Sequence, residues 1–309
     1  MAACIENCRS QTSVSPCLLE CTQYYHMISA RNSLFWCTLW PCKPGFGEQI
    51  LDAVCASEII PGDINIDDLW LKIQEEAVAD TQEDPLLHNY YFSSIFSYKT
   101  LETALANLLA MKLSNSSLSR NALFETFLSI FSEDHDVRRA LRDDLKAAKE
   151  RDPACISYVH CLLNFKGFQA CQAYRAAHKL WSQGRKALAL LIQSRVSDVF
   201  AVDIHPGAKI GSGLLLDHGT GIVIGETAIV GDNVTILHNV TLGGTGKASG
   251  DHIRRHPKIG DGVFIGAGSK VLGSIRIGEG AKIGAGSMVL KEVPPNATAV
   301  GNPARIIGA

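Results

Sequence analysis

A chain of 309 residues is long enough for two domains that each bury a hydrophobic core. A formal net charge of −2 and an isoelectric point near 6.5 give no reason to expect binding to nucleic acid or to a membrane surface. Since no run of about 18 apolar residues occurs, the sequence predicts no segment that crosses a bilayer.

Residues 1–62 form a first segment without clear hydrophobic periodicity. Its cysteine spacings lack the C-x-x-C pairs of a zinc site, and a secreted disulfide scaffold would be small and carry a signal peptide. We therefore interpret the cysteines as reduced thiols of an intracellular protein. The segment holds seven of the ten: Cys4, Cys8, Cys17, Cys21, Cys37, Cys42 and Cys55.

The same segment leaves two roles open. An organellar transit peptide is rich in arginine and poor in acidic residues. Five acidic residues nevertheless occur here: Glu6, Glu20, Glu48, Asp52 and Glu58. A plastid or mitochondrial targeting segment and a disordered extension of a cytosolic protein are therefore equally compatible with this composition.

Residues 63–200 are predicted to form an α-helical domain. Apolar residues recur at the three- and four-residue steps of amphipathic helices, as in the run from Leu101 to Leu109. The pair Asp152-Pro153 predicts a helix start, with Asp152 as the N-cap and Pro153 in the first helical position. The stretch 165–196 then predicts two more helices with a break near Gly184.

The composition changes after Ala201, since residues 201–309 hold 22 of the 27 glycines and no Tyr, Trp or Cys. Aliphatic residues recur there with a period of six, which fits neither an α-helix nor an isolated strand. It fits a triangular coil in which each hexad supplies one short strand and one core residue, so the pattern predicts about four coils of parallel β-helix. The aliphatic positions are Ile204, Ile210, Leu216, Ile224, Val230, Ile236, Leu242, Ile259, Ile265, Val271, Ile277, Ile283 and Val289.

The hexad register breaks twice. Two extra residues follow the pair Asp217-His218, and a polar, glycine-rich loop over residues 243–258 separates the two halves of the repeat. Breaks in a regular solenoid are common positions for functional residues. Solenoids with flat sides commonly trimerise side to side, so we expect a site in the cleft between subunits.

The sequence resembles the serine acetyltransferases, and most closely their plant members, over roughly residues 67–309. The motifs are RDPACISYVHCLLNFKGFQACQAYR in the helical part and VDIHPGAKIG, LLLDHGTGIVIGETA, TLGGTGK, RHPKIGDG and AVGNPARIIG in the repeats. The resemblance implies an α+β chain, with an N-terminal α-helical domain followed by a left-handed parallel β-helix of hexapeptide repeats.

The resemblance also implies an activity and an assembly. Family members transfer acetyl from acetyl-CoA to the hydroxyl of L-serine, which gives O-acetyl-L-serine and CoA for cysteine biosynthesis. We therefore expect L-serine and acetyl-CoA as substrates and no permanently bound cofactor or metal. A homotrimer or a dimer of trimers is the expected assembly, and inhibition by L-cysteine is an expectation from the family.

The resemblance places His218 at the family's catalytic base and Asp203 at its acidic partner. The chemistry agrees, because a serine hydroxyl needs a base to take its proton as it attacks a thioester, and an unperturbed imidazole titrates at a pKa of about 6.5. A carboxylate on the other ring nitrogen fixes the tautomer. Since residues 201–309 contain no cysteine to carry the acetyl group, direct transfer is favoured over a ping-pong reaction.

By the same resemblance, Asp152 and Asp217 contact the amino and hydroxyl ends of L-serine, although an ordinary helix cap is the competing role for Asp152. Arg255 and His256 contact the serine carboxylate, for which a guanidinium is well shaped. Acetyl-CoA is expected to lie along the coil. Its predicted contacts are the backbone near Gly266, Ala267, Gly284 and Ala285 and, through a phosphate, the side chain of Arg305.

Two features depart from the family pattern. The protruding loop usually reads Gly-Asp-Arg-His-Pro but here reads GDHIRRHP, three residues longer, which leaves Arg254 open as an alternative to Arg255. His252 and His256 are four residues apart, as in some metal sites. Since no carboxylate pattern accompanies them, we do not predict a metal site there. The chain also stops at NPARIIGA, before the tail with which plant members bind cysteine synthase, so we expect no stable complex with that enzyme.

Three alternative functions remain open on the sequence. The first is a catalytically impaired homologue that acts in assembly or regulation. The second is a hexapeptide acyltransferase with another hydroxyl acceptor, which a panel of acceptors would identify. The third is a metal-dependent β-helix enzyme of the carbonic anhydrase type, which needs three histidines that meet between subunits.

Overall fold

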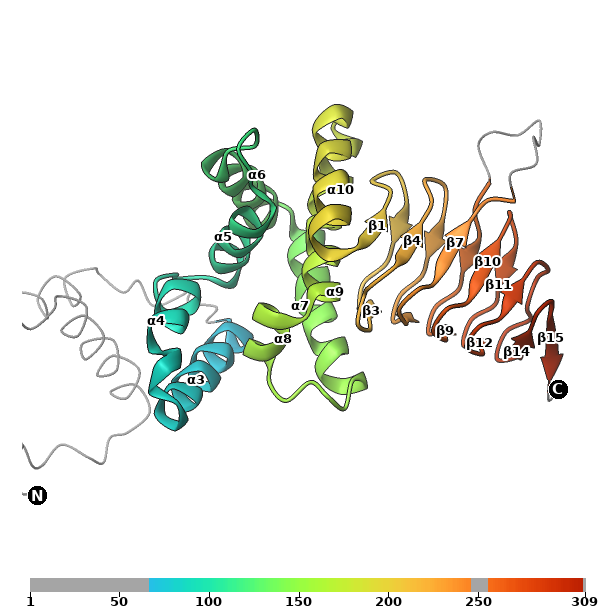
Figure 1. Cartoon of the computed structure of the whole chain (residues 1–309), viewed down its shortest axis with the longest axis horizontal. Helices are drawn as coiled ribbons and strands as arrows, with labels where there is room; N and C mark the ends of the chain where they lie inside the picture. The colour runs from blue at the N-terminus through green and yellow to red at the C-terminus, as the bar shows by residue number, and fades with distance from the viewer. Residues whose placement is uncertain (1–66, 246–254, 308–309) are drawn as a thin grey trace, which may run out of the picture. The chain divides into compact units, whose positions relative to one another are not determined.

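The computed structural model describes residues 67–245 and 255–307 (Figure 1). A helical part, Asp68–Phe200, is followed by short strands from Val202 onward, so the predicted fold class, helices followed by a parallel β-helix, is confirmed. The first segment, residues 1–62, lies outside the described residues. No helix in the described ranges is long and apolar enough to cross a membrane.

Three helices of the helical part, α5, α7 and α8, begin at a capping side chain. Thr100 accepts a hydrogen bond from the backbone N–H of Thr103, and Asp134 accepts one from that of Val137. The break near Gly184 is confirmed, since that residue has a φ of +80° between two helices. The helices are α3 (Asp68–Glu83), α4 (His88–Tyr91), α5 (Leu101–Leu113), α6 (Arg120–Glu133), α7 (His135–Arg151), α8 (Tyr158–Asn164), α9 (Lys166–Ser182) and α10 (Lys186–Phe200), with single turns at Pro85–Leu87 and Phe92–Phe96.

The predicted helix start at Asp152-Pro153 is wrong. Helix α7 ends at Arg151, and Asp152 is its C-cap in an extended conformation, with a φ of −103°. A residue before proline is disfavoured in the helical region, which ends α7 there. The Asp152 carboxylate instead accepts a hydrogen bond of 2.8 Å from the backbone N–H of Ala154, and α8 begins six residues after Asp152, at Tyr158, capped by Ser157.

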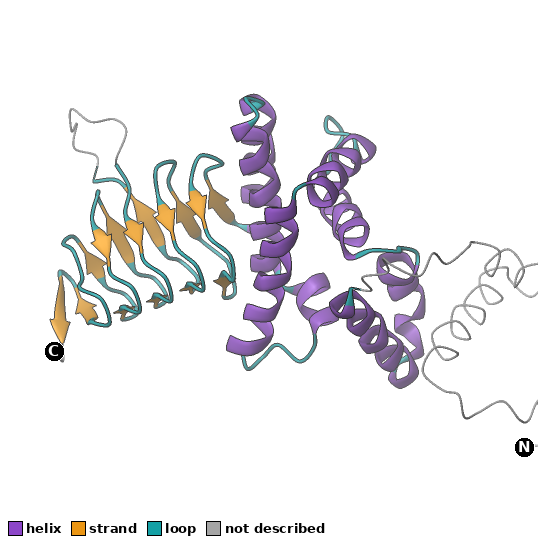
Figure 2. Ribbon diagram, turned by 180° about the vertical axis from the view of Figure 1, so that it is seen from behind, coloured by secondary structure: helices purple, strands orange, loops and turns teal. Residues whose placement is uncertain are grey.

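The strands form three parallel sheets, one for each face of a triangular coil, visible as stacked rows in Figures 1 and 2. Face 1 consists of β1 (Val202–Ile204), β4 (Ile222–Ile224), β7 (Thr241–Gly243), β10 (Lys270–Leu272) and β13 (Met288–Val289). Face 2 consists of β2 (Lys209–Ile210), β5 (Ile229–Val230), β8 (Lys258–Ile259) and β11 (Arg276–Ile277). Face 3 consists of β3 (Leu215–Leu216), β6 (Thr235–Ile236), β9 (Phe264–Ile265), β12 (Lys282–Ile283), β14 (Thr298–Gly301) and the antiparallel β15 (Ala304–Ile307).

The hexad positions fill the interior of the coil as predicted. Twelve of the thirteen are buried, and the exception, Ile210, is partly buried in the first coil. Each stacks on the aliphatic residue of the next coil, as in the pairing of Ile204 with Ile224 and of Ile224 with Leu242. The regular core therefore fixes where the turns between faces project, and these turns carry the candidate site.

Two edges of the coil matter for the site. We call the edge where face 3 turns into face 1 the 3–1 edge, with turns at 217–221, 237–240, 266–269 and 284–287. The edge where face 1 turns into face 2 is the 1–2 edge, with turns at 205–208, 225–228, 244–257 and 273–275. One face, made of strands of two or three residues, separates these edges.

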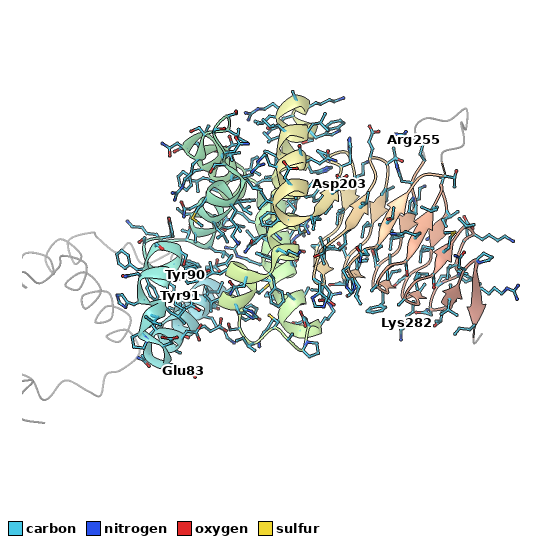
Figure 3. All side chains as sticks on the ribbon, in the orientation of Figure 1. Glu83, Tyr90, Tyr91, Asp203, Arg255 and Lys282 are labelled. Atoms are coloured by element: carbon cyan, nitrogen blue, oxygen red, sulfur yellow. The ribbon has the colours of Figure 1, made fainter. Side chains whose placement is uncertain are left out.

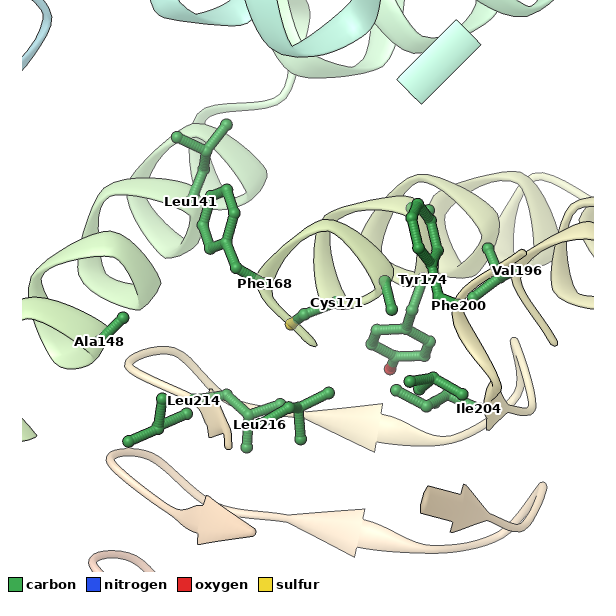
Figure 4. Close-up of a cluster of buried hydrophobic side chains, with 14 of the residues drawn as sticks. Leu141, Ala148, Phe168, Cys171, Tyr174, Val196, Phe200, Ile204, Leu214 and Leu216 are labelled. Atoms are coloured by element: carbon green, nitrogen blue, oxygen red, sulfur yellow. The ribbon is translucent and has the colours of Figure 1, made fainter. Parts of the chain in front are cut away.

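Helices α7 and α9 pack on the first coil through a cluster of buried apolar side chains that includes Phe168, Tyr174 and Leu214 (Figure 4). A buried ion pair lies beside it: Arg175 donates to Asp144 at 2.8 and 2.9 Å. Asp144 also accepts the backbone N–H of Leu214 at 2.8 Å, and Arg175 donates to the Gly211 carbonyl at 2.8 Å. The segment that leads into His218 is thus held by the helical part.

Candidate active site

His218 projects from the 3–1 edge at the first break in the hexad register. Its backbone has a φ of +57°, in the left-handed region that non-glycine residues seldom adopt. The turn is closed by hydrogen bonds from the Gly219 N–H to the Asp217 carbonyl at 2.7 Å and from the Thr220 N–H to the His218 carbonyl at 2.9 Å. We call residues 217–221 the His218 turn. The imidazole is 72% exposed, so a substrate can reach it.

Two ionisable side chains accompany His218. The Asp217 carboxylate lies 3.8 Å from its Nε2 atom, and the ring of His238 meets the His218 ring edge to face, with centroids 5.4 Å apart. The Nδ1 atom of His238 is buried and has no hydrogen-bond partner within the described ranges. His238 was not among the residues predicted from the sequence, although its position in the next turn of the same edge could have identified it.

Asp203 lies on β1 (Figure 3). Its Oδ1 atom accepts a hydrogen bond of 2.6 Å from the side-chain amide of Gln193 on α10. The carboxylate beside His218 in this structure belongs to Asp217 rather than to Asp203. The pairing of Asp203 with His218 therefore stays a prediction. Gln193 is a second residue that sequence reasoning missed, because it belongs to another element.

The N-terminus of α9 supports the His218 turn from the helical part. Gly167 approaches β3 so closely that an added Cβ would lie 2.0 Å from the carbonyl oxygen of Leu216. A Cβ on Gly219 would in turn lie 3.0 Å from the Cα of Gly167. The Lys166 ammonium donates a hydrogen bond to the Thr220 hydroxyl. Two backbones thus meet at glycines directly beside the proposed base.

The backbone positions predicted to bind acetyl-CoA lie on the same edge as His218. Successive turns are joined by hydrogen bonds, from the Gly268 N–H to the His238 carbonyl at 2.9 Å and from the Gly286 N–H to the Ala267 carbonyl at 2.8 Å. Arg305 is exposed on β15, at the far end of the β-helix. The structure therefore brings these predicted residues to one edge: Asp217, His218, Gly266, Ala267, Gly284 and Ala285.

Arg255 and His256 lie on the other edge, the 1–2 edge, at the end of the long loop (Figure 3). The Arg255 guanidinium pairs with the Glu226 carboxylate at 3.0 Å. His256 is partly buried, and burial together with the Arg255 charge lowers its pKa, so its imidazole is neutral near pH 7. The extra loop residues His252, Ile253 and Arg254 lie outside the described residues, so the assignment of the carboxylate contact to Arg254 stays open.

The ring nitrogen Nδ1 of His256 lies 2.8 Å from the Thr227 hydroxyl and 3.1 Å from the Thr227 backbone nitrogen. His205, one coil earlier on the same edge, accepts the Gly207 N–H at 3.0 Å, and burial lowers its pKa as well. Two imidazoles and several charged groups therefore gather on the 1–2 edge, whereas the exposed His218 belongs to the 3–1 edge.

A cavity of about 410 Å³ opens between α7, α9 and the first coil, with Asp136, Asp143 and Asp232 in its lining. None of the predicted site residues lines it. Asp152 lies apart from both edges, in the turn after α7. Within one chain the predicted residues thus divide between two edges and a helical turn.

Comparisons with known proteins agree with this architecture. A family model for the N-terminal part of serine acetyltransferases matches residues 69–173, and a model for six hexapeptide repeats of bacterial transferases matches residues 256–291. Serine acetyltransferase 1, chloroplastic, from Arabidopsis thaliana is 56% identical over 308 residues, which cover 100% of this chain and 90% of that protein.

Solved structures give the same result. A soybean serine acetyltransferase complexed with serine is 58% identical with a TM-score of 0.74, over 77% of this chain and 97% of that one. A serine acetyltransferase from Brucella abortus strain S19, in complex with coenzyme A, is 49% identical with a TM-score of 0.75, over 79% and 96% of the two chains. With this identity over its whole length and with the matching fold, the chain belongs to the serine acetyltransferase family.

Proposed function

We propose that this protein transfers the acetyl group of acetyl-CoA to the hydroxyl of L-serine, with His218 as general base. One observation carries the proposal: an exposed imidazole projects from a strained turn on the same edge as the stacked turns of Gly266 and Gly284. A pantetheine arm along those turns would bring its thioester towards His218. The relatives solved with serine and with coenzyme A hold the proposed acceptor and the product form of the proposed acetyl donor.

The proposed reaction begins when His218 takes the proton of the serine hydroxyl as its oxygen attacks the thioester carbon. The tetrahedral intermediate collapses, the carbon–sulfur bond breaks, and the CoA thiolate takes up the proton from the imidazolium. We propose that His238, whose ring packs edge to face on that of His218, donates a hydrogen bond to the negative oxygen that develops at the carbonyl. Transfer is direct, because residues 201–309 contain no thiol that could carry the acetyl group.

Asp203 is the proposed partner of His218 in this reaction. The Gln193 amide occupies its Oδ1 atom, which leaves Oδ2 for an imidazole N–H. A carboxylate in that position fixes the tautomer of the base and stabilises the imidazolium.

Serine binding requires both edges. We propose that Asp152 and Asp217 bind the amino and hydroxyl ends of L-serine and that Arg255 and His256 bind its carboxylate. In one chain, the 3–1 and 1–2 edges are separated by a strand of three residues, about 10 Å at 3.3 Å per residue, plus the turns. Two neighbouring copies in a homotrimer, with or without pairing of trimers, would place one edge of each type in the same cleft.

Acetyl-CoA in the proposed site lies along the 3–1 edge. Backbone groups near Gly266, Ala267, Gly284 and Ala285 would bind its pantetheine arm, and Arg305 would contact a phosphate. Acetyl-CoA acts here as a co-substrate that leaves as CoA after each turnover.

We also propose an organellar location, in the plastid or the mitochondrion. The relative named as chloroplastic aligns over the whole chain, including residues 1–62. A fluorescent protein fused behind residues 1–62 tests this, because cytosolic fluorescence would contradict an organellar address.

The test of the function is acetyl-CoA consumption by the purified full chain with L-serine, compared with His218→Ala. The exposed His218 ring makes few packing contacts, so we expect the variant to fold and its kcat to fall by about 10² to 10⁴. His135→Ala, another exposed histidine, is the matched control and should retain activity. Turnover that survives in His218→Ala, or that needs a hydroxyl acceptor other than L-serine, would overturn the proposal.

A mixing experiment tests the shared site. His218→Ala and Arg255→Ala chains are each expected to be impaired alone. Assembled together at random, they would form about a quarter of their sites from one intact edge of each kind. Recovered turnover supports a site between two copies, and no recovery in verified mixed assemblies rejects it.

A further inference from the structure

Thr227 contacts the end of the long loop through its side-chain hydroxyl and its backbone N–H. Its hydroxyl oxygen accepts the backbone N–H of Arg255 at 3.0 Å and that of His256 at 3.2 Å. Its hydroxyl also lies 2.8 Å, and its backbone nitrogen 3.1 Å, from Nδ1 of the His256 ring. These four contacts join residues 28 and 29 positions apart in the chain, across the loop.

The directions of these bonds fix the tautomer of His256. A backbone N–H can only donate, so Nδ1 of the ring must accept and carries no proton. The two backbone N–H groups of the loop donate to the Thr227 oxygen, which leaves the hydroxyl hydrogen to donate to the same Nδ1. The proton of the neutral imidazole is therefore on Nε2, which has no hydrogen-bond partner among the described side chains.

Gly225 makes room for this ring. A Cβ at that position would lie 2.1 Å from the His256 Nε2 atom and 2.2 Å from its Cδ2 atom, so the imidazole lies directly over the glycine backbone. Burial and the Arg255 guanidinium both lower the pKa of His256, which favours the neutral ring that this bonding pattern requires. We call Gly225, Glu226, Thr227, Arg255 and His256 the His256 seat.

We propose that Thr227 is a positioning residue that holds His256 as the Nε2–H tautomer, so that His256 donates a hydrogen bond to the carboxylate of the acceptor. This rests on the proposed function, in which Arg255 and His256 bind that carboxylate. Arg255 supplies the charge, and the neutral His256 supplies one directed N–H. With the other tautomer, the Nε2 lone pair would face the carboxylate oxygens and repel them.

The test compares Thr227→Val with Thr227→Ser in the full chain. Valine keeps the branched shape but loses the hydroxyl, whereas serine keeps it. Since the hydroxyl acts on the acceptor site and not on the thioester, we expect Thr227→Val to raise the KM for L-serine about tenfold. The kcat and the KM for acetyl-CoA should change by less than about twofold, and Thr227→Ser should restore the KM for L-serine.

A spectroscopic measurement decides the tautomer without activity. Solid-state ¹⁵N NMR of the histidine-labelled protein, with His256→Gln to assign the signal, should show Nδ1 unprotonated and Nε2 protonated in the parent chain. Thr227→Val should add signal from the Nδ1-protonated form. A parent ring protonated on Nδ1, or equal KM values in the two Thr227 variants, would overturn the proposal. If the parent binds no L-serine but shows the Nε2–H tautomer, the positioning stands and the proposed acceptor fails.

Discussion

The His218 turn and the His256 seat hold their histidines in different ways. The His218 turn leaves its imidazole exposed and draws its support from the helical part, through Lys166 and Gly167 of α9. The His256 seat is built by the β-helix itself, since Thr227 and Glu226 of one coil bind the loop residues that follow the next. The proposed base is thus positioned from outside the repeat, and the proposed carboxylate site from within it.

Because of this difference, substitutions in the two regions should affect different kinetic constants. Loosening the helical part should disturb the chemical step first, because the segment Gly211–Leu214 that leads to His218 is bound by Asp144 and Arg175. Changes inside the His256 seat should disturb serine affinity and leave the helical part unaffected. The predictions that follow therefore separate effects on kcat from effects on the KM for L-serine.

Asp144→Ala should have the largest effect, on stability. It removes a fully buried carboxylate, so the Leu214 N–H loses its acceptor and the Arg175 guanidinium loses its counter-charge while it keeps its bond to the Gly211 carbonyl. The Asp144 carboxylate raises the pKa of Arg175 well above its usual range, although burial alone would lower it, so the arginine stays charged in the interior. Removing one member of a buried ion pair, which leaves the other charge buried and uncompensated, lowers the free energy of unfolding by about 3–5 kcal/mol.

Chemical denaturation followed by circular dichroism measures this loss. Glu150→Ala, an exposed acidic residue on the same helix, is the control and should change the free energy of unfolding by less than about 0.5 kcal/mol. Equal stabilities of the two variants would show that the ion pair does not join α7 and α9 to the first coil.

Gly167→Ala should lower kcat by about a hundredfold. Its Cβ would lie 2.0 Å from the Leu216 carbonyl oxygen, a backbone atom that cannot swing aside, so the His218 turn must shift. A displacement of about 1 Å at a reacting group costs on the order of 10² in rate. Steady-state kinetics with both substrates varied measures this, and a kcat equal to that of the parent would contradict the supporting role of α9.

Gly225→Ala is the matched glycine change in the His256 seat. The obstacle there is the far end of the His256 side chain, which can rotate away, so we expect a folded protein with a raised KM for L-serine. Should both alanine variants lower the same constant, the distinction between the two regions would fail.

Gln193→Leu should have a smaller effect, a fall in kcat of about tenfold. The variant removes the hydrogen bond to Asp203 but not its carboxylate, and a hydrogen bond to a charged group is worth about 1.5–3 kcal/mol. A double-mutant cycle with Asp203→Asn measures whether the two act together. If Gln193 acts through Asp203, the double variant should be no slower than Asp203→Asn alone. Additive losses would place Gln193 in another role.

The β-helix could be predicted from the sequence because each hexad identifies one short strand and the residue that points into the core. The break after Asp217-His218 likewise located the His218 turn, since extra residues in a fixed register must project. The resemblance to serine acetyltransferases added the activity, and the comparisons confirmed the family. The roles of His218 and of the other site residues stay predictions.

Contacts between distant elements could not be predicted in this way. Thr227 binds His256 across 29 residues, and Gln193 reaches Asp203 from a helix, so neither pair has a local pattern. Asp152-Pro153 failed for another reason, because a carboxylate before proline suits both a helix cap and the turn that ends one. His238 carries no local signal beyond its coil position.

The smallest expected effect is a dependence of stability on pH that belongs to the His256 seat. Burial and Arg255 lower the pKa of His256, whereas Glu226 opposes the shift and His205 adds to it. An unfolded histidine binds a proton at a pKa of about 6.5, while the folded ring resists it to lower pH. The contribution to stability is therefore complete above about pH 6.5 and is lost as the pH falls to the lowered folded pKa. Denaturation midpoints measured across this range should fall on acidification in the parent chain and fall less in His256→Gln. An identical pH dependence in the two chains would show that the seat does not hold a neutral ring.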